Sequence, residues 1–132
     1  WADLAINPRW RISAGLSTLR KDLHLKPGSA DVFGIAYAGN DPERQAQLRT
    51  SIDLTRSLQF DATLRAVDDL ASPAVPGYVE ADARLAWRIS DATELSVSGA
   101  NLLHSQHLEF VNSALPRREI RRTVFVALRR VF

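Results

Sequence analysis

Apolar and polar residues alternate along most of this chain, and the alternation continues to its last residue. Counting back by twos from Phe132 gives Arg130, Leu128, Val126 and Val124, which apart from the arginine are apolar. A period of two places apolar side chains on one face of a β-strand and polar side chains on the other. The end of the chain is therefore predicted to be an amphipathic strand finishing on an aromatic residue, a pattern typical of the closing strand of a transmembrane β-barrel.

Earlier segments show the same alternation. The pattern predicts a partial strand at residues 1–6 and strands at about Trp10–Leu19, Gln45–Leu54, Leu58–Ala66, Tyr78–Arg88 and Glu94–Leu103. With the last strand, this gives an all-β, antiparallel sheet of about six strands plus a partial one. Bacterial transmembrane barrels need about eight strands or more to close. We therefore expect residues 1–132 to be the C-terminal strands of a larger barrel; the alternative is a chain that closes a barrel by oligomerising.

The connections between these segments alternate in length. Short turns are predicted near Asn7, Thr55 and Asp91, and the longer loops are Pro27 to Glu43, Asp68 to Gly77 and His104 to Pro116. Bacterial barrels keep short turns on the periplasmic side and long loops outside the cell. On that assignment the three loops are extracellular and the chain ends on the periplasmic side.

Aromatic residues of the apolar face gather near the short turns. Trp10 and Phe60 begin strands that rise from this side, and Trp87 and Phe132 end strands that return to it. Aromatic rings in membrane barrels concentrate at the level of the lipid headgroups. These four residues are predicted to form an aromatic girdle.

The opposite face carries most of the charge in the strands. Its members are Arg49, Asp53, Asp61, Arg65, Glu80, Asp82, Arg84 and Arg88. Such a set could select a substrate, or it could line a water-filled lumen with cross-strand ion pairs and meet a plug. We favour the second interpretation, because inward charge is general in barrels whose wall contacts water.

Composition excludes several other classes. The net charge is only +2 and the arginines are spread along the strands, which does not favour a nucleic-acid-binding surface. The chain has no cysteine and no apolar run of the roughly 20 residues that a spanning helix requires. Ser96 and Ser98 have no histidine in plausible register, so no enzyme is predicted.

No cofactor or metal site is predicted either. His104 and His107 lie three residues apart and could bind a metal or haem. Because no carboxylate cluster accompanies them in the sequence, we interpret them as polar loop residues.

A soluble antiparallel β-sheet binding module remains the alternative, because its strands would also alternate. That alternative does not account for aromatic residues at one level or for a terminus on Phe132. We therefore favour strands whose apolar side faces lipid. A second layer of the same molecule packed against Trp10, Leu64 and Leu85 would contradict this.

Several segments resemble the C-terminal barrel region of TonB-dependent outer-membrane receptors. These are Gly39-Asn40-Asp41-Pro42-Glu43-Arg44-Gln45 before a strand, Val75-Pro76-Gly77-Tyr78-Val79 at the start of another, and Glu94 to Leu103 before the arginine-rich last strand. In the family an asparagine–leucine pair stands at the top of the penultimate strand, as Asn101-Leu102 do here. The resemblance covers nearly the whole chain and rests on the order and spacing of these segments.

The resemblance implies a barrel of about twenty-two strands plugged by an N-terminal domain. It also implies a role in TonB-energised uptake of a scarce solute such as an iron–siderophore, haem or cobalamin, across the outer membrane of a Gram-negative bacterium. The implied partners are outer-membrane lipid, the barrel-assembly machinery, the small-molecule solute, and TonB through a region upstream of this chain.

By the same resemblance, the assembly signal consists of Val124, Val126, Leu128 and Phe132. Arg130 departs from the family pattern, which usually has an aromatic or apolar residue two positions before the terminal phenylalanine. A charge near the membrane interface costs only about 0–1 kcal/mol, because the side chain can extend toward the headgroups.

Overall fold

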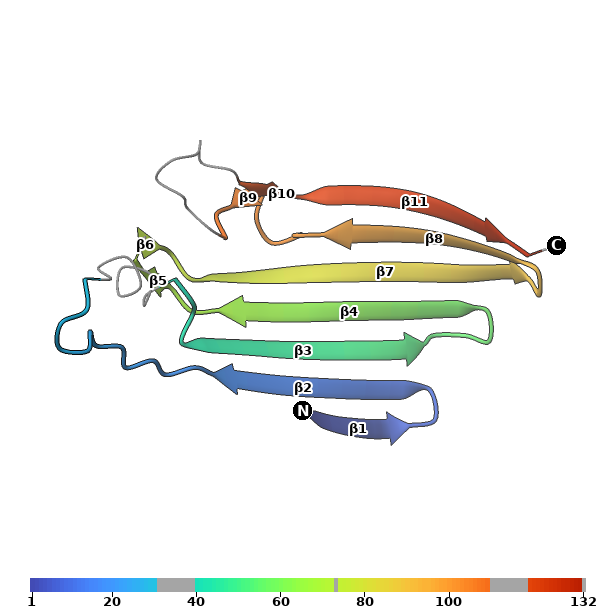
Figure 1. Cartoon of the computed structure of the whole chain (residues 1–132). Helices are drawn as coiled ribbons and strands as arrows, with labels where there is room; N and C mark the ends of the chain where they lie inside the picture. Colours follow the sequence, from blue (N-terminus) through green and yellow to red (C-terminus); the bar gives the residue numbers. More distant parts are fainter. Residues whose placement is uncertain (31–39, 73, 110–118, 132) are drawn as a thin grey trace.

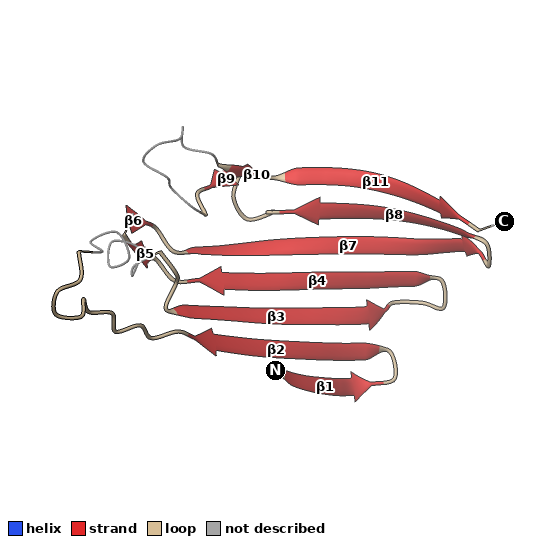
Figure 2. Ribbon diagram, viewed as in Figure 1, coloured by secondary structure: helices blue, strands red, loops and turns tan. Residues whose placement is uncertain are grey.

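The computed structural model describes residues 1–30, 40–72, 74–109 and 119–131, and these residues form an antiparallel sheet of seven strands (Figures 1 and 2). The strands follow one another across the sheet in chain order. They are β1 (Ala2–Asn7), β2 (Trp10–Thr18), β3 (Arg44–Asp53), β4 (Leu58–Val67), β7 (Tyr78–Ser90), β8 (Thr93–Ala100) and β11 (Thr123–Arg130). The predicted fold class, with six full strands and a shorter first one, is confirmed.

The pairing register keeps the two kinds of side chain on separate faces. One row across neighbouring strands consists of Trp10, Ile52, Phe60, Leu85, Val97 and Val126. The next row consists of Arg11, Ser51, Asp61, Arg84, Ser98 and Phe125. Adjacent rows point to opposite faces of a sheet. We call the first side the apolar face and the second the polar face, although β11 adds Phe125 to the polar face.

The apolar face has no second layer against it in the described part of the chain. Leu64 and Leu85 are each 42% exposed, Trp10 is only half-buried, and Leu48, Val97, Val126 and Leu128 are also exposed. The buried apolar residues are Leu70, Val75 and Ala86, and only Ala86 belongs to a long strand, where it lies on the polar face. The outcome that would have contradicted a lipid-facing surface is therefore not observed.

Short turns and longer connections lie at opposite ends of the sheet. Figure 1 shows the three short turns at the end where the chain terminates and the longer connections at the other end. Two turns are closed by side chains, because Asn7 Oδ1 accepts the Arg9 N–H at 2.8 Å and Thr55 Oγ1 accepts the Leu58 N–H at 3.0 Å. Such local bonds are what favour asparagine and threonine in turns.

The structure corrects the end of one predicted strand and the content of one predicted loop. The strand predicted for Glu94–Leu103 ends at Ala100, because Asn101 adopts a φ of 55°, in the left-handed region. The segment Asp68 to Gly77, predicted as a plain loop, contains a small hairpin of β5 (Leu70–Ala71) and β6 (Ala74–Val75). Leu70 and Val75 pair within it and are buried, which gives this connection an apolar contact of its own.

A second pair of short strands lies beyond β8. They are β9 (Gln106–His107) and β10 (Ile120–Arg121), and they hold the two ends of the last connection together beside β11. Among the described residues there is no helix with the length and apolar character needed to cross a membrane.

We predict that Asn101→Gly is tolerated and that Asn101→Val destabilises the protein by about 1–2 kcal/mol. Glycine adopts positive φ without strain, whereas a β-branched residue is strongly disfavoured there. The measurement is the unfolding midpoint of the intact protein and of both variants. Equal midpoints for the glycine and valine variants would show that this backbone conformation has no energetic importance.

Candidate functional site

The candidate site lies on the polar face, at the end of the sheet that carries the longer connections. Here β7 extends beyond β8: its pairing with β8 begins only at Ala83, opposite Gly99, while its pairing with β4 continues to Tyr78. Residues 78–82 of β7 therefore have a ladder on one side only. The segment after Asn101 lies against the other side.

Three successive backbone N–H groups attach this segment to β7. Asn101 N–H donates to Asp82 Oδ1 at 2.9 Å, and Leu102 N–H donates to the Ala81 carbonyl at 2.9 Å. Leu103 N–H donates to Glu80 Oε2 at 3.1 Å. Two side-chain carboxylates thus act as acceptors where a continuing strand would have used backbone carbonyls.

Glu80 is the most buried charged residue in the described part of the chain, at 2% exposure. Its second oxygen accepts a hydrogen bond from His104 Nδ1 at 2.7 Å, and His107 Nδ1 lies 3.2 Å from the same oxygen. Burial of a carboxylate is costly unless hydrogen bonds and opposite charge compensate for it. The hydrogen bonds from Leu103 and His104 provide that compensation, whereas His107 Nδ1 lies close by without forming a hydrogen bond.

His107 links Glu80 to a second carboxylate. Its side chain is 8% exposed, and its Nε2 lies 3.1 Å from Glu109 Oε1. Its ring stacks on Tyr78 with the centroids 4.5 Å apart. Glu109 Oε1 also accepts hydrogen bonds from Arg65 at 2.8 Å and from the Tyr78 hydroxyl at 3.0 Å. The cluster therefore joins β4, β7 and the segment after β8; we call Arg65, Tyr78, Glu80, His104, His107 and Glu109 the histidine–carboxylate cluster.

Glu109 lies outside the long strands, and its ionisation responds to these contacts. Burial by itself would raise the pKa of its carboxyl group. The hydrogen bonds from His107 and Tyr78, together with the positive charge of Arg65, outweigh that effect and lower the pKa below the usual value. The carboxylate form is therefore the one that this site stabilises.

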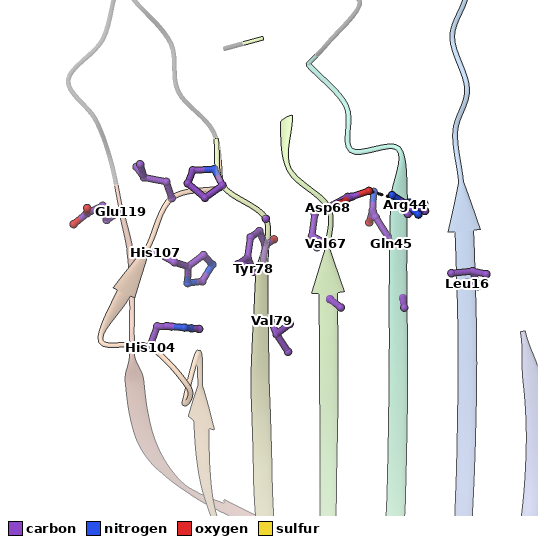
Figure 3. Close-up of a pocket in the computed structure, with 15 residues that line it drawn as sticks. Leu16, Arg44, Gln45, Val67, Asp68, Tyr78, Val79, His104, His107 and Glu119 are labelled. Atoms are coloured by element: carbon purple, nitrogen blue, oxygen red, sulfur yellow. Dashed lines mark hydrogen bonds and ion pairs between the residues drawn. The ribbon is translucent and has the colours of Figure 1, made fainter. Parts of the chain in front are cut away.

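A hollow of about 770 Å³ opens beside the cluster (Figure 3). Its lining includes Tyr78, His104 and His107 at one end and Leu16, Arg44 and Asp68 at the other. Arg44 Nε and Asp68 Oδ2 form an ion pair at 3.0 Å there. The lining also includes Leu16, Ala46, Ala66 and Val79, which form one row of the apolar face, so residues of both faces border this open hollow at the end of the sheet.

Arg84 and Arg49, two further charged residues of the polar face, contact residues of neighbouring strands and of the chain start. Arg84 lies 3.5 Å from Asp61 on β4 and 2.7 Å from Glu94 on β8. The guanidinium of Arg49 stacks over the ring of Trp1, 5.1 Å from its centroid. The Arg84 contacts agree with a face lined by paired charges.

The structure places the sequence-predicted site residues as follows. Trp10 and Phe60 share one row through Ile52, and Trp87 lies two positions farther along β7, opposite Leu58. Val124, Val126 and Leu128 share the apolar face of β11, while Phe132 lies outside the described residues. The girdle and the assembly signal stay predictions.

The surroundings of the histidines were the main feature that the sequence interpretation missed. The sequence predicts His104 and His107 to be polar loop residues without carboxylate neighbours, but Glu80 lies 24 residues before His104 and contacts it directly. Glu109, two residues after His107, was a signal available in the sequence. In the described ranges no group of three histidine, cysteine or acidic side chains is arranged to hold a metal ion.

The architecture corresponds to a known class of fold, because the sheet has the fold of part of an outer-membrane receptor barrel. The chain is similar to the crystal structures of the ferric-catecholate import receptor Fiu from E. coli K12. For the closed form the TM-score is 0.71 at 19% identity, over 96% of this chain and 19% of that chain. For the open form the TM-score is 0.70 at 18% identity, over 95% and 19%.

The chain thus spans about a fifth of the length of the receptor it matches. Neither a protein-family model nor a curated protein matches the sequence. The likeness confirms the predicted fold, an antiparallel fragment of a receptor barrel, at an identity too low to transfer function directly. That the fragment is the C-terminal one stays a prediction.

We predict that Glu109→Gln lowers stability at neutral pH and that the loss disappears in acid. Because the pKa of Glu109 is lowered on folding, its contribution is present above the usual carboxyl pKa and is lost as the pH falls through the lowered value. The effect is expected to be about 1 kcal/mol or less, since solvent screens the pair. The measurement is the thermal midpoint of both proteins near neutral pH and at a series of decreasing pH values, where the difference should shrink below the usual carboxyl pKa.

Glu119→Gln, which changes an exposed carboxylate, is the control. A Glu109→Gln deficit that stays constant across these pH values would contradict the assignment.

Proposed function

We propose that residues 1–132 form the C-terminal wall of an outer-membrane receptor that imports an iron–siderophore. The observation that supports this most is a sheet with an uncovered apolar face that aligns, over 96% of the chain, with the barrel of an import receptor. An exposed apolar surface of this extent requires an apolar partner. In a barrel that partner is the hydrocarbon of the membrane.

The proposed solute class rests on the receptor that the chain resembles. Fiu imports ferric catecholates by its name, and a ferric siderophore is one of the solutes that the sequence resemblance implies. Haem and cobalamin are the other members of that set. The wall contributes the polar face and the long connections, and a plug and a TonB-contacting segment would belong to a region upstream.

The proposed location and partners follow from the same role. The protein would lie in the bacterial outer membrane, contact its lipid through the apolar face, and be inserted by the barrel-assembly machinery. An enzymatic role is not proposed, and neither is binding of nucleic acid. The soluble binding module is not favoured, because the described residues place no protein layer over the apolar face.

The proposed function is tested by deleting the gene for the intact protein and measuring uptake of iron from catecholate siderophores, haem and cobalamin. Loss of siderophore–iron uptake, restored by the intact gene, is the expected result. Unchanged uptake of all three solutes, or recovery of the intact protein as a detergent-free monomer from the soluble fraction, would contradict the proposal.

We predict that Leu64→Arg destabilises the barrel by about 2–4 kcal/mol in lipid, because an arginine on the lipid face near the midplane carries that cost. Thr63→Arg is the matched control: the residue is adjacent but on the polar face, opposite Arg49 and Asp82. The measurement is unfolding by denaturant in lipid vesicles. Equal effects of the two substitutions would show that the two faces are not lipid and lumen.

We predict that Phe132→Asp strongly reduces insertion of the intact protein, since the terminal aromatic residue is part of the proposed assembly signal. Val131→Asp, one position earlier and of opposite parity, is the control and is expected to insert at nearly the native level. The measurement is the fraction of heat-modifiable barrel in outer-membrane preparations. Normal insertion of the Phe132 variant would remove the proposed role.

A further inference from the structure

The segment from Asn101 to Glu109 has a defined place on the polar face, and Glu80 contacts more of its residues than any other side chain of β7 does. A backbone hydrogen bond from the Leu102 N–H to the Ala81 carbonyl joins this segment to β7 beyond the end of β8. Hydrogen bonds from Leu103 and His104 converge on the Glu80 carboxylate, and His107 Nδ1 lies 3.2 Å from it. One side chain therefore takes the place of several ladder positions.

The position of Glu80 suits it for this task. It is paired with Arg65 in the sheet register, so it stands on a strand that β4 supports from the other side. At 2% exposure it cannot exchange its partners for water while the segment is in place. Removing one partner of a buried charge leaves the rest uncompensated, which makes the anchoring cooperative.

The segment held by Glu80 also bounds the hollow beside the cluster. His104, His107 and Leu108 line it together with Tyr78 of β7 (Figure 3). The position of the segment therefore determines the shape of the hollow at the end of the sheet that carries the long connections. A shift of the segment would change both its width and the side chains that face into it.

We propose that Glu80 is a positioning residue that fixes the Asn101–Glu109 segment against the barrel wall and so sets the affinity of the receptor for its solute. The solute part of this inference rests on the proposed function. Glu80 acts through His104, His107 and the Leu103 backbone and does not itself contact the solute. Glutamine keeps an acceptor oxygen but loses the charge. Glu80→Gln is therefore expected to weaken the anchoring less than Glu80→Ala does.

The anchoring is tested in the full receptor by placing a cysteine at Leu108, which is half-buried in a stretch that has no natural cysteine. With Glu80 present, the thiol is expected to react slowly with a membrane-impermeant maleimide on whole cells. Glu80→Ala is expected to raise the labelling rate about tenfold, the factor expected for losing a hydrogen bond to a buried charge. Glu80→Gln is expected to raise it by a smaller factor.

Asp61→Ala is the matched control. It removes a carboxylate from the same face that pairs with Arg84 and is not in the histidine–carboxylate cluster, so labelling should stay at the native rate. If Glu80→Ala does not assemble, the double variant His104→Ala, His107→Ala removes the same contacts from the other side. Native labelling in every assembled Glu80 or histidine variant would overturn the anchoring.

The affinity is tested with a catecholate siderophore loaded with radioactive iron. The Glu80 variants are expected to raise the half-saturating concentration while the maximal uptake rate per assembled receptor is unchanged, a split that general misfolding would not produce. Faster labelling with an unchanged half-saturating concentration would refute the affinity role and leave the anchor in place. Absence of uptake by the native receptor would refute the proposed function, while the labelling result would still decide the anchor.

Discussion

The structure depends on an unbroken pairing register across its long strands. From β2 to β7 the ladders run without a bulge, and the two irregularities lie beside short turns, at Ala5/Asn7 and Arg88/Ser90. Because the side-chain period is two, a slip of one residue would move Asp61 and Arg84 to the apolar face. Placing such charges in hydrocarbon costs several kcal/mol. This cost disfavours any other register, and the observed register keeps the charged side chains on the polar face.

The charged residues of the polar face have different surroundings at its two ends. Near the short turns its charges pair across strands while remaining partly exposed, as Arg84 does between Asp61 and Glu94. Such pairs contribute little stability individually, but they keep charge balanced on a surface that contacts water. At the other end, Glu80 is buried and the histidines are close to it. Charged side chains thus face water in ion pairs at one end, and at the other end a buried carboxylate holds the segment after β8 against the sheet.

The sequence was sufficient for the strands because alternation is a local signal. Apolar residues at Leu58, Phe60, Ala62 and Leu64 predicted β4 to within a residue of its bounds, and turn residues at Asn7 and Thr55 predicted the short connections. Strand ends were less predictable. Glu94 to Leu103 continues the alternation only weakly, and the positive φ at Asn101 that ends β8 depends on tertiary contacts with Asp82 and Ala81.

The histidine–carboxylate cluster could not be predicted from the sequence, because it also depends on where a strand ends. Alternation placed Glu80 on the polar face, but it does not show that β8 stops short and leaves residues 78–82 of β7 with one free edge. A backbone group at such an edge needs a partner, and the Ala81 carbonyl finds one in the Leu102 N–H. The next N–H, of Leu103, then bonds to the Glu80 side chain. The meeting of His104 and Glu80 is thus a consequence of where one strand ends.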